Sequence, residues 1–343
     1  MRILQNTLYV TSPDAYLALD GENIVVLCGE AETARVPLHN LEGVVTFGYT
    51  GASPALMGAC CRRNIAVSFL SPQGRFLARV TGEQRGNVTL RREQYRAAEH
   101  PQRSLSMARP MIAAKLFNAR WVLERALRDH SLRVDQAAVE AASQALAAAV
   151  KAALAAETPE MLRGIEGEGA ARYFGVLDEL ILQQKDAFFL HGRSRRPPLD
   201  NVNALLSFVY TLLAHETAAA LETVGLDPYV GFLHGERPGR ASLALDIMEE
   251  LRAVMADRFV LTLINRRAVT ADGFSRKEDG AVTMADDTRR AVLSAWQSRK
   301  QETLVHPFLG EKIAWGLVPY TQALLLARFL RGDLDGYPPF FWK

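Results

Sequence analysis

Apolar and polar residues occur in short alternating runs over the first eighty residues of the chain. The stretch YLALDGENIVVLC joins two such runs through a turn at residues 20–23, which is the pattern of a β-hairpin. Four further runs, ARVPL, GVVTF, IAVSFL and RFLARV, follow at close spacing, with turn residues between most of them. This pattern predicts a small all-β unit at the N-terminus.

The period of the apolar positions changes near residue 90. From there on apolar side chains recur three and four residues apart, as at Ile112, Leu116 and Ala119, which is the period of an α-helix. We therefore expect an α+β protein of two domains. Residues 1–85 would form the small all-β domain and residues 86–343 a larger all-α domain.

Several helices are predicted within the second domain. Residues 137–156 are dominated by alanine, which favours a peripheral helix with little side chain to pack. Thr158 and Pro159 are typical of a helix start, and that helix runs toward Glu166. The C-terminal GYPPFFWK is expected to pack as a tail on its own domain. Further helices are expected at about 200–223, 242–262, 282–303 and 317–331.

The composition is that of a folded protein, because 49% of the 343 residues are apolar and 23% are charged. No apolar stretch approaches the roughly 18 residues of a membrane helix, and no export signal is recognisable. We therefore expect a cytoplasmic protein with no membrane partner and with reduced cysteines.

Arginine dominates the positive charge, since 33 of the 40 basic residues are Arg. Residues 1–61 carry two Arg against six acidic residues, whereas residues 62–109 carry ten Arg against three Glu. Arg suits bidentate phosphate contacts, so this polarised charge indicates a nucleic-acid surface. Biased codon usage and an ordinary solvated face are the alternatives that the charge alone leaves open.

Segments far apart in the sequence carry candidate acids and an imidazole. Glu166 lies among small residues, His234 precedes a turn rich in Gly and Pro, and the next helix carries Asp246, Glu249 and Glu250. Asp246 shares a helix face with an acid three or four residues on. One His with several carboxylates is a hard-oxygen ligand set that suits Mg²⁺ or Mn²⁺. The alternatives are an exposed bend around Glu166 and a solvated acidic helix face.

Three arginines, Arg193, Arg195 and Arg196, precede a Pro-Pro break and a helix that begins near Asp200. Such a cluster at a helix start binds phosphate well, and a flexible charged loop is the alternative. Ser242 is expected to cap the acidic helix. The signatures of P-loop NTPases, dinucleotide-binding proteins, zincins and α/β-hydrolases are missing, so phosphodiester chemistry with a hard metal ion remains.

The chain resembles the CRISPR-associated Cas1 family, the integrase subunit of spacer acquisition, in four ordered motifs: GIEGEGAARYF, RRPPLDNVNALLSF, VGFLHGERPGRASLALDIMEELR and ADRFVLTLINRR. The form resembles that of subtype I-C. The resemblance implies that the domain of residues 1–85 dimerises and that two such homodimers flank a central Cas2 dimer. It also implies that Glu166, His234 and Glu249 bind a divalent metal, Mg²⁺ or Mn²⁺, and that Asp246 lies next to it.

The activity that the resemblance implies is transesterification, in which the 3′-OH of a short DNA duplex attacks a phosphodiester at a CRISPR repeat boundary. The enzyme would be a metal-dependent DNA endonuclease and integrase in antiviral defence, with prespacer and repeat DNA as double-stranded partners. A non-catalytic DNA-binding architectural protein and a metallo-phosphoesterase for small substrates are the alternatives. DNA contacts are expected among six arginines: Arg172, Arg193, Arg195, Arg196, Arg237 and Arg240.

Overall fold

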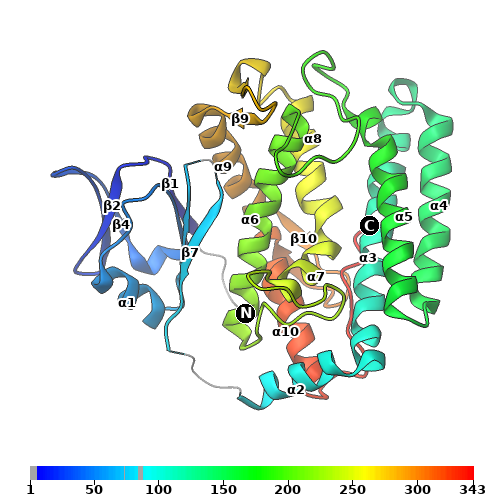
Figure 1. Ribbon diagram of the computed structural model, residues 1–343, viewed down its shortest axis with the longest axis horizontal. Helices are drawn as coiled ribbons and strands as arrows, with labels where there is room; N and C mark the ends of the chain where they lie inside the picture. The colour runs from blue at the N-terminus through cyan, green and yellow to red at the C-terminus, as the bar shows by residue number, and fades with distance from the viewer. Residues whose placement is uncertain (1–5, 73, 84–87) are drawn as a thin grey trace. The chain divides into compact units, whose positions relative to one another are not determined.

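The computed structural model describes residues 6–72, 74–83 and 88–343, and the chain divides into two compact units (Figure 1). The first unit comprises Met1–Arg85 and Met284–Glu302, and the second comprises Gly86–Thr283 and Thr303–Lys343. Strands dominate the first unit and helices the second, which confirms the predicted mixture of α and β structure. The assignment of residues 284–302 to the helical domain is wrong.

Two sheets form most of the first unit. The predicted hairpin is confirmed, because Asp20 pairs with Asn23 and Gly21 adopts φ +57° in the turn. That hairpin lies in an antiparallel sheet of β2 (Ala15–Asp20), β3 (Asn23–Cys28) and β4 (Ala31–Pro37). The other sheet has the order β1 (Asn6–Val10), β5 (Leu41–Phe47), β6 (Ala66–Leu70) and β7 (Phe76–Val80), in which only β7 pairs antiparallel.

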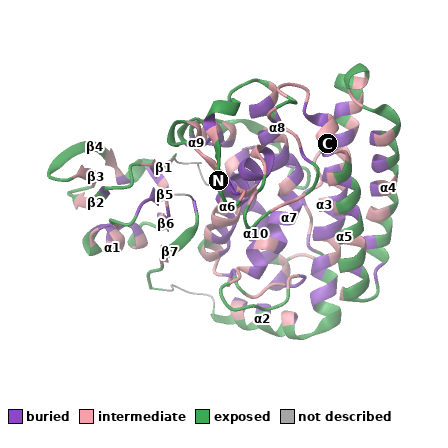
Figure 2. Ribbon diagram, turned by 45° about the horizontal axis from the view of Figure 1, so that its top comes forward, coloured by how far each residue is buried: buried purple, intermediate pink, exposed green. Residues whose placement is uncertain are grey.

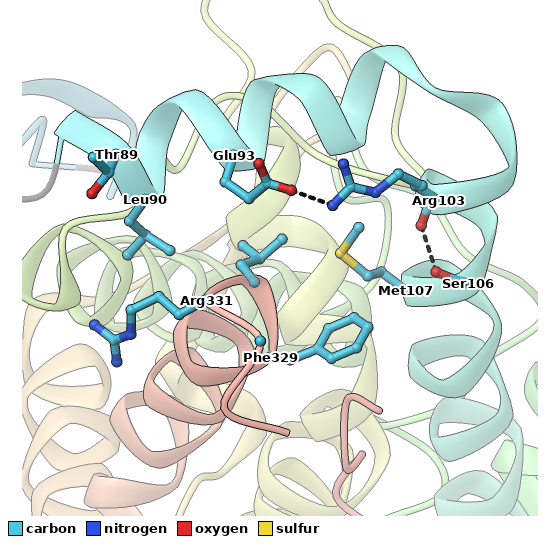
Figure 3. Close-up of a pocket in the computed structure, with 10 residues that line it drawn as sticks. Thr89, Leu90, Glu93, Arg103, Ser106, Met107, Phe329 and Arg331 are labelled. Carbon is cyan, nitrogen blue, oxygen red and sulfur yellow. Dashed lines mark hydrogen bonds and ion pairs between the residues drawn. The ribbon is translucent and has the colours of Figure 1, made fainter. Parts of the chain in front are cut away.

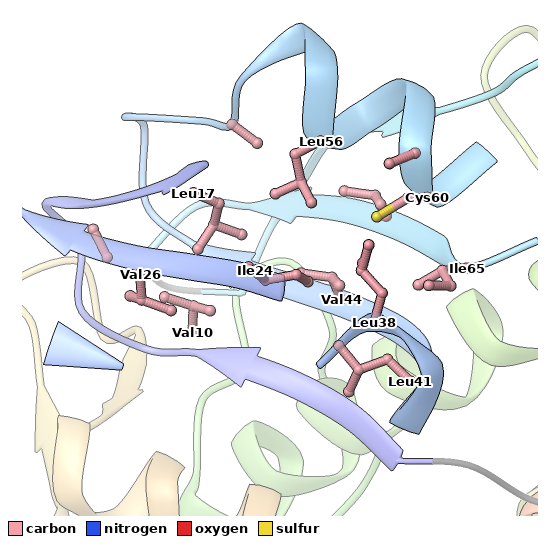
Figure 4. Packing of buried hydrophobic residues seen from close by; sticks show 14 residues of the cluster. Val10, Leu17, Ile24, Val26, Leu38, Leu41, Val44, Leu56, Cys60 and Ile65 are labelled. Atoms are coloured by element: carbon pink, nitrogen blue, oxygen red, sulfur yellow. The ribbon is translucent and has the colours of Figure 1, made fainter. Parts of the chain in front are cut away.

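Helices make the first unit α+β, so its prediction as all-β is wrong. α1 (Pro54–Arg62) connects the parallel strands β5 and β6, which no tight turn could join. Its apolar face packs on the sheets, and Figure 4 shows Leu56 and Cys60 of α1 among buried strand residues such as Leu17, Ile24 and Val44. The three cysteines are free thiols, as predicted.

The helix α9 (Asp286–Gln301) belongs to the first unit through polar contacts that its sequence does not reveal. The Lys300 side chain is buried, and its Nζ donates to Thr7 Oγ1 at 3.1 Å. The guanidinium of Arg289 lies 5.5 Å from the centroid of the Phe47 ring. An apolar period predicts that a helix buries one face, but it does not identify what covers that face.

Long helices build the second unit, and in Figure 2 buried positions concentrate on α3, α6 and α7. α3 packs against α4, α5 and α7, and α6 packs against α7 and α10. The bounds are α2 (Val88–Glu99), α3 (Pro101–His130), α4 (Gln136–Ala155), α5 (Pro159–Val176), α6 (Asn201–Val224), α7 (Ser242–Leu251), a π-helical turn (Arg252–Asp257), α8 (Arg258–Asn265) and α10 (Val318–Leu330).

Short hairpins make the prediction of an all-α second domain wrong. β8 (Phe274–Arg276) pairs with β9 (Val282–Met284), and β10 (Thr303–Val305) pairs with β11 (Lys312–Ala314). Strands of three residues are too short to give a period-2 signal. Short 3₁₀ turns lie at Leu38–Asn40, Ser131–Arg133, Leu177–Leu180, Ala271–Gly273 and Trp315–Leu317.

In the part of the chain that the structure describes, two helices, α4 and α6, are long and apolar enough to cross a membrane by length and composition alone. The apolar window of α6 is 67% buried inside the protein, so α6 is a core helix. The window of α4 is 28% buried, and this Ala-rich helix lies along α3 as a peripheral element. After α10, Tyr337 and Phe340 are buried, which confirms the predicted packing of the C-terminal tail.

Candidate catalytic centre

The acids of α7 are buried, which excludes a solvated acidic face. Asp246, Glu249 and Glu250 are 1%, 3% and 0% exposed, because α7 packs against both α3 and α6. The predicted cap by Ser242 is wrong: the N-cap residue is Ala241, and the Ser242 hydroxyl donates to a loop carbonyl instead. Buried carboxylates need partners, and these three acids have different ones.

Asp246 holds the loop before α7 together with the imidazole of His234. Its Oδ2 accepts hydrogen bonds from Phe232 N at 2.6 Å and Leu233 N at 3.0 Å, and its Oδ1 accepts from His234 N at 3.0 Å. Gly231 permits this approach, since a Cβ there would lie 2.6 Å from Asp246 Oδ2. Oδ1 also lies 2.6 Å from His234 Nδ1, which orients the ring and leaves Nε2 for a further ligand.

Glu166 lies within the continuous helix α5, so the alternative of an exposed bend is wrong. Thr158 caps the helix by accepting a hydrogen bond from Met161 N at 3.2 Å, as predicted. Gly169 lets α5 approach α3 closely, because a Cβ there would collide with Leu116. This close packing turns Glu166 toward α3.

Lys115 of α3 joins the two candidate acids. Its Nζ forms an ion pair with Glu166 Oε1 and another, at 2.8 Å, with Glu249 Oε2. The second oxygen of Glu249, Oε1, lies 3.2 Å from a guanidinium nitrogen of Arg252. The side chains of Lys115 and Arg252 are 11% and 16% exposed, so these pairs are shielded from solvent far more than surface pairs are.

These cations set the charge state of Glu249. Burial alone raises its pKa, but the charges of Arg252 and Lys115 outweigh burial and lower the pKa to about 2. His234 also contributes to the lowered pKa, so the imidazole lies within electrostatic range of this carboxylate. Glu249 is therefore ionised throughout the neutral pH range.

A π-helical turn after α7 brings Arg252 and Asp257 into one cluster with Tyr210. Tyr210 donates to Asp257 Oδ1 at 2.5 Å, and the Arg252 guanidinium lies 4.9 Å from the Tyr210 ring centroid. Burial raises the pKa of Asp257 to about 6, although Tyr210 and Arg193 oppose the rise. Arg252 is the first residue of this turn, and it contacts both Tyr210 and Glu249.

Within the described ranges, no three His, Cys, Asp or Glu side chains lie close enough to hold a metal ion as they stand. Two carboxylates from separate helices nevertheless converge on one cation, the ammonium of Lys115. Apart from that ammonium, Glu249 Oε2 has no hydrogen-bonding partner in the same ranges. With His234 nearby, the donors are those that a hard divalent ion prefers, so their chemistry fits the predicted metal.

The six candidate DNA-binding arginines fall into two groups. Arg193 donates to Asn203 Oδ1 and lies 5.2 Å from the Tyr210 ring, and Arg240 donates to Gly235 O, so both already support the local structure. Exposed guanidinium groups can reach a phosphate more directly, although Arg172 also pairs with Glu168 of the same helix at 3.5 Å. The exposed group comprises Arg172, Arg195, Arg196 and Arg237.

A cavity of about 560 Å³ lies elsewhere in the second unit, between α2, the start of α3 and the end of α10 (Figure 3). An ion pair between Arg103 and Glu93 borders it, and Met107 and Phe329 contribute apolar surface. No predicted site residue lines this cavity. A pocket of only about 20 Å³ adjoins the candidate centre and is lined in part by Lys115, Tyr173, Tyr210, Arg252 and Asp257.

Sequence reasoning missed Lys115, Arg252 and Asp257. Lys115 is one of only seven lysines and interrupts an apolar run, AAKLF, which is a usable signal for a buried partner of an acid. Arg252 follows Glu249 by three residues, the spacing of a helix ion pair. Asp257 lies in the motif ADRFVLTLINRR but was assigned no role, because the π-turn that positions it is not visible in an α-helical period.

Acids, an imidazole and cations gathered from separate segments of a helical unit are typical of phosphoryl-transfer enzymes. The family model described as CRISPR associated protein Cas1 matches residues 8–298. A CRISPR-associated endonuclease Cas1 of Rhodospirillum rubrum is 52% identical over 347 residues, with 100% of both chains covered. The chain belongs to the Cas1 family, as its motifs predicted.

Two solved structures share the fold. A casposase bound to an integration product has a TM-score of 0.84 at 22% identity, with 99% of this chain and 95% of that chain covered. A chain of a Cas6-RT-Cas1–Cas2 complex has a TM-score of 0.82 at 23% identity, with 99% of this chain and 36% of that chain covered.

Proposed function

We propose that this chain is a divalent-metal-dependent DNA endonuclease and integrase that inserts short duplexes into a CRISPR repeat array. One observation carries the proposal: Glu166 of α5 and Glu249 of α7 meet at a single cation, beside an imidazole that Asp246 orients. The family's relatives are named endonucleases, and a structure with the same fold is bound to an integration product.

In this proposal Glu166, Glu249 and His234 hold Mg²⁺ or Mn²⁺, whose Lewis acidity would stabilise charge on a phosphodiester. Asp246 fixes the imidazole through Nδ1, which would leave Nε2 available as a ligand. Arg252 and its Tyr210 contact keep Glu249 ionised and in place. The helical unit thus supplies a preorganised negative site between two cationic side chains.

The proposed reaction is a direct transesterification. The 3′-OH of the incoming duplex loses its proton as its oxygen bonds to phosphorus, the repeat's own P–O3′ bond breaks, and the released 3′ oxygen takes up a proton. The number of phosphodiester bonds is unchanged, so the step needs no cofactor that supplies energy. Because no covalent bond forms between the protein and DNA, the rate enhancement comes from positioning of the reactants and stabilisation of charge.

The partners proposed are prespacer and repeat DNA, a second copy of this chain, and a Cas2 dimer. The complex of Cas1 with Cas2 among the structures of this fold supports the Cas2 partner. Dimerisation through the strand-rich first unit and membership of subtype I-C follow from the motif resemblance alone. The exposed Arg172, Arg195, Arg196 and Arg237 are the arginines proposed to contact phosphate.

The substitution Glu166→Gln tests this function, with Glu168→Gln, an exposed acid on the same helix, as the matched control. We expect Mn²⁺-dependent strand transfer, measured on branched DNA, to fall by about 10²–10³-fold in the first variant and to stay unchanged in the second. DNA binding should persist in both variants. Full strand transfer by Glu166→Gln contradicts the proposed site, and turnover of small phosphoesters in place of DNA contradicts the substrate.

A further inference from the structure

The ammonium of Lys115 lies where a metal shared by Glu166 and Glu249 would lie. It contacts Glu166 Oε1 and Glu249 Oε2, one oxygen from each of two acids on separate helices. These oxygens belong to the two carboxylates that the proposed function assigns to the metal. An ammonium group and a divalent ion cannot both occupy the space between them.

We propose that Lys115 is an exchangeable internal cation: it holds the two carboxylates together before metal binds, and it leaves them when the metal enters. This inference rests on the proposed function, because it takes Glu166 and Glu249 as metal ligands. It assigns Lys115 a role in metal loading that its helix and its spacing in the sequence do not reveal.

The surroundings of Glu249 explain why such a cation is needed. Glu249 is 3% exposed, and Glu166 approaches it from α5, so without a positive charge two carboxylates would face each other in a shielded space. Arg252 neutralises only the Oε1 side of Glu249. The Oε2 side depends on Lys115, since no other hydrogen-bonding partner for it exists in the described residues.

The side chain of lysine suits an exchange better than that of arginine would. Its ammonium is a compact charge on four rotatable methylene groups, so it can swing away while the helix stays in place. Arg252, stacked on Tyr210, keeps its hold on the other oxygen of Glu249 throughout. After the exchange, the freed ammonium adds positive charge beside the metal, where a DNA phosphate would bind.

The experiment measures Mn²⁺ binding to the full-length protein by isothermal titration calorimetry, without DNA. We expect Lys115→Met to bind Mn²⁺ about tenfold more tightly than the wild type, because the competing cation is gone. Its melting temperature without metal should fall and should recover with Mn²⁺. Lys115→Arg, which keeps the charge, should not gain affinity, and Lys151→Met on α4, an exposed position, is the matched control.

A second measurement uses the unaltered chain, in case Lys115→Met does not fold. The rate at which Lys115 is acetylated by acetic anhydride, followed by mass spectrometry, should rise at least threefold when Mn²⁺ is added. An unchanged or weaker Mn²⁺ affinity in Lys115→Met overturns the exchange, as does an acetylation rate that Mn²⁺ leaves constant.

Glu249→Gln separates this failure from failure of the proposed function. If Mn²⁺ binds the wild type and the Glu249→Gln variant equally, the metal site itself is wrong. If Glu249→Gln loses Mn²⁺ binding while Lys115→Met matches the wild type, the metal site stands and only the exchange is wrong.

Discussion

Two acids that are neighbours on α7 have opposite electrostatic surroundings. Glu249 faces the cations Lys115 and Arg252, and its pKa is lowered to about 2. Glu250 faces the C-terminal tail and α10, where burial raises its pKa to about 8. Both side chains are buried, so burial does not distinguish them.

Glu250 has good hydrogen bonds but no cation among its described contacts. Its Oε1 accepts from Tyr337 OH at 2.6 Å, and its Oε2 accepts from Phe340 N at 2.8 Å and Gln322 Nε2 at 2.9 Å. These bonds lower the pKa of Glu250 by less than burial raises it. Of these two buried carboxylates, only Glu249 faces full positive charges and has a lowered pKa, so Glu249 is suited to metal chemistry and Glu250 anchors the tail.

The largest effect is expected when Glu249 loses its charge. Glu249→Gln should reduce Mn²⁺-dependent strand transfer by about 10²–10³-fold, because a proposed ligand is lost. It should also lower the free energy of unfolding at pH 7 by about 3 kcal/mol, since Lys115 and Arg252 stay buried with less compensating charge. Strand-transfer assays and urea denaturation measure the two effects.

Glu250→Gln is the control for that experiment, since it removes an acid from the adjacent position. Strand transfer by Glu250→Gln should stay within about twofold of the wild type. Equal losses of activity in the two variants would mean that the different electrostatic surroundings of the two acids do not give them different functions.

A pH series sharpens the contrast further. The folded protein keeps the Glu250 proton up to about pH 8, whereas the unfolded chain releases it near pH 4.5. The contribution of Glu250 to stability is therefore greatest below pH 4.5 and declines as pH rises toward 8. Glu250→Gln should remove this decline. Its free energy of unfolding relative to that of the wild type should therefore rise by about 3 kcal/mol from pH 5 to pH 8.5. Urea denaturation across that range measures it, and parallel curves for both proteins contradict the raised pKa.

Much of the helical fold was predictable because its signals are local. The Ala-rich helix at 137–156 and the helix that begins at Thr158 were recognised from propensity and capping, which depend on adjacent residues. α9 was recognised as a helix but assigned to the wrong unit. Its polar contacts with Thr7 and Phe47 join residues nearly 300 and 240 positions apart, and no local pattern encodes them.

The candidate site was predictable in its acids but not in its cations. Motif order pointed to Glu166, His234 and Glu249 before any geometry was known, although their role as metal ligands stays a prediction. Lys115 contributes because α3 packs against both α5 and α7. The spacing of residues along the sequence does not reveal how these three helices pack. The same limit applies to Glu250, whose opposite surroundings depend on a tail 90 residues away.

The smallest effect is expected from Tyr337→Phe, which changes only the Glu250 side of α7. The hydroxyl donates to Glu250 and accepts from Gln322 Nε2 at 2.8 Å, so its loss should cost about 1–2 kcal/mol of unfolding free energy. This hydrogen bond lowers the pKa of Glu250, so the pKa should rise further in the variant. The decline in stability that comes from Glu250 should then end at a higher pH than in the wild type. Strand transfer should be unchanged, because Glu249 and its cations lie on a different face of the helix. A large loss of activity at unchanged stability would show that the tail reaches the catalytic centre, and the division between the two faces of α7 would then be wrong.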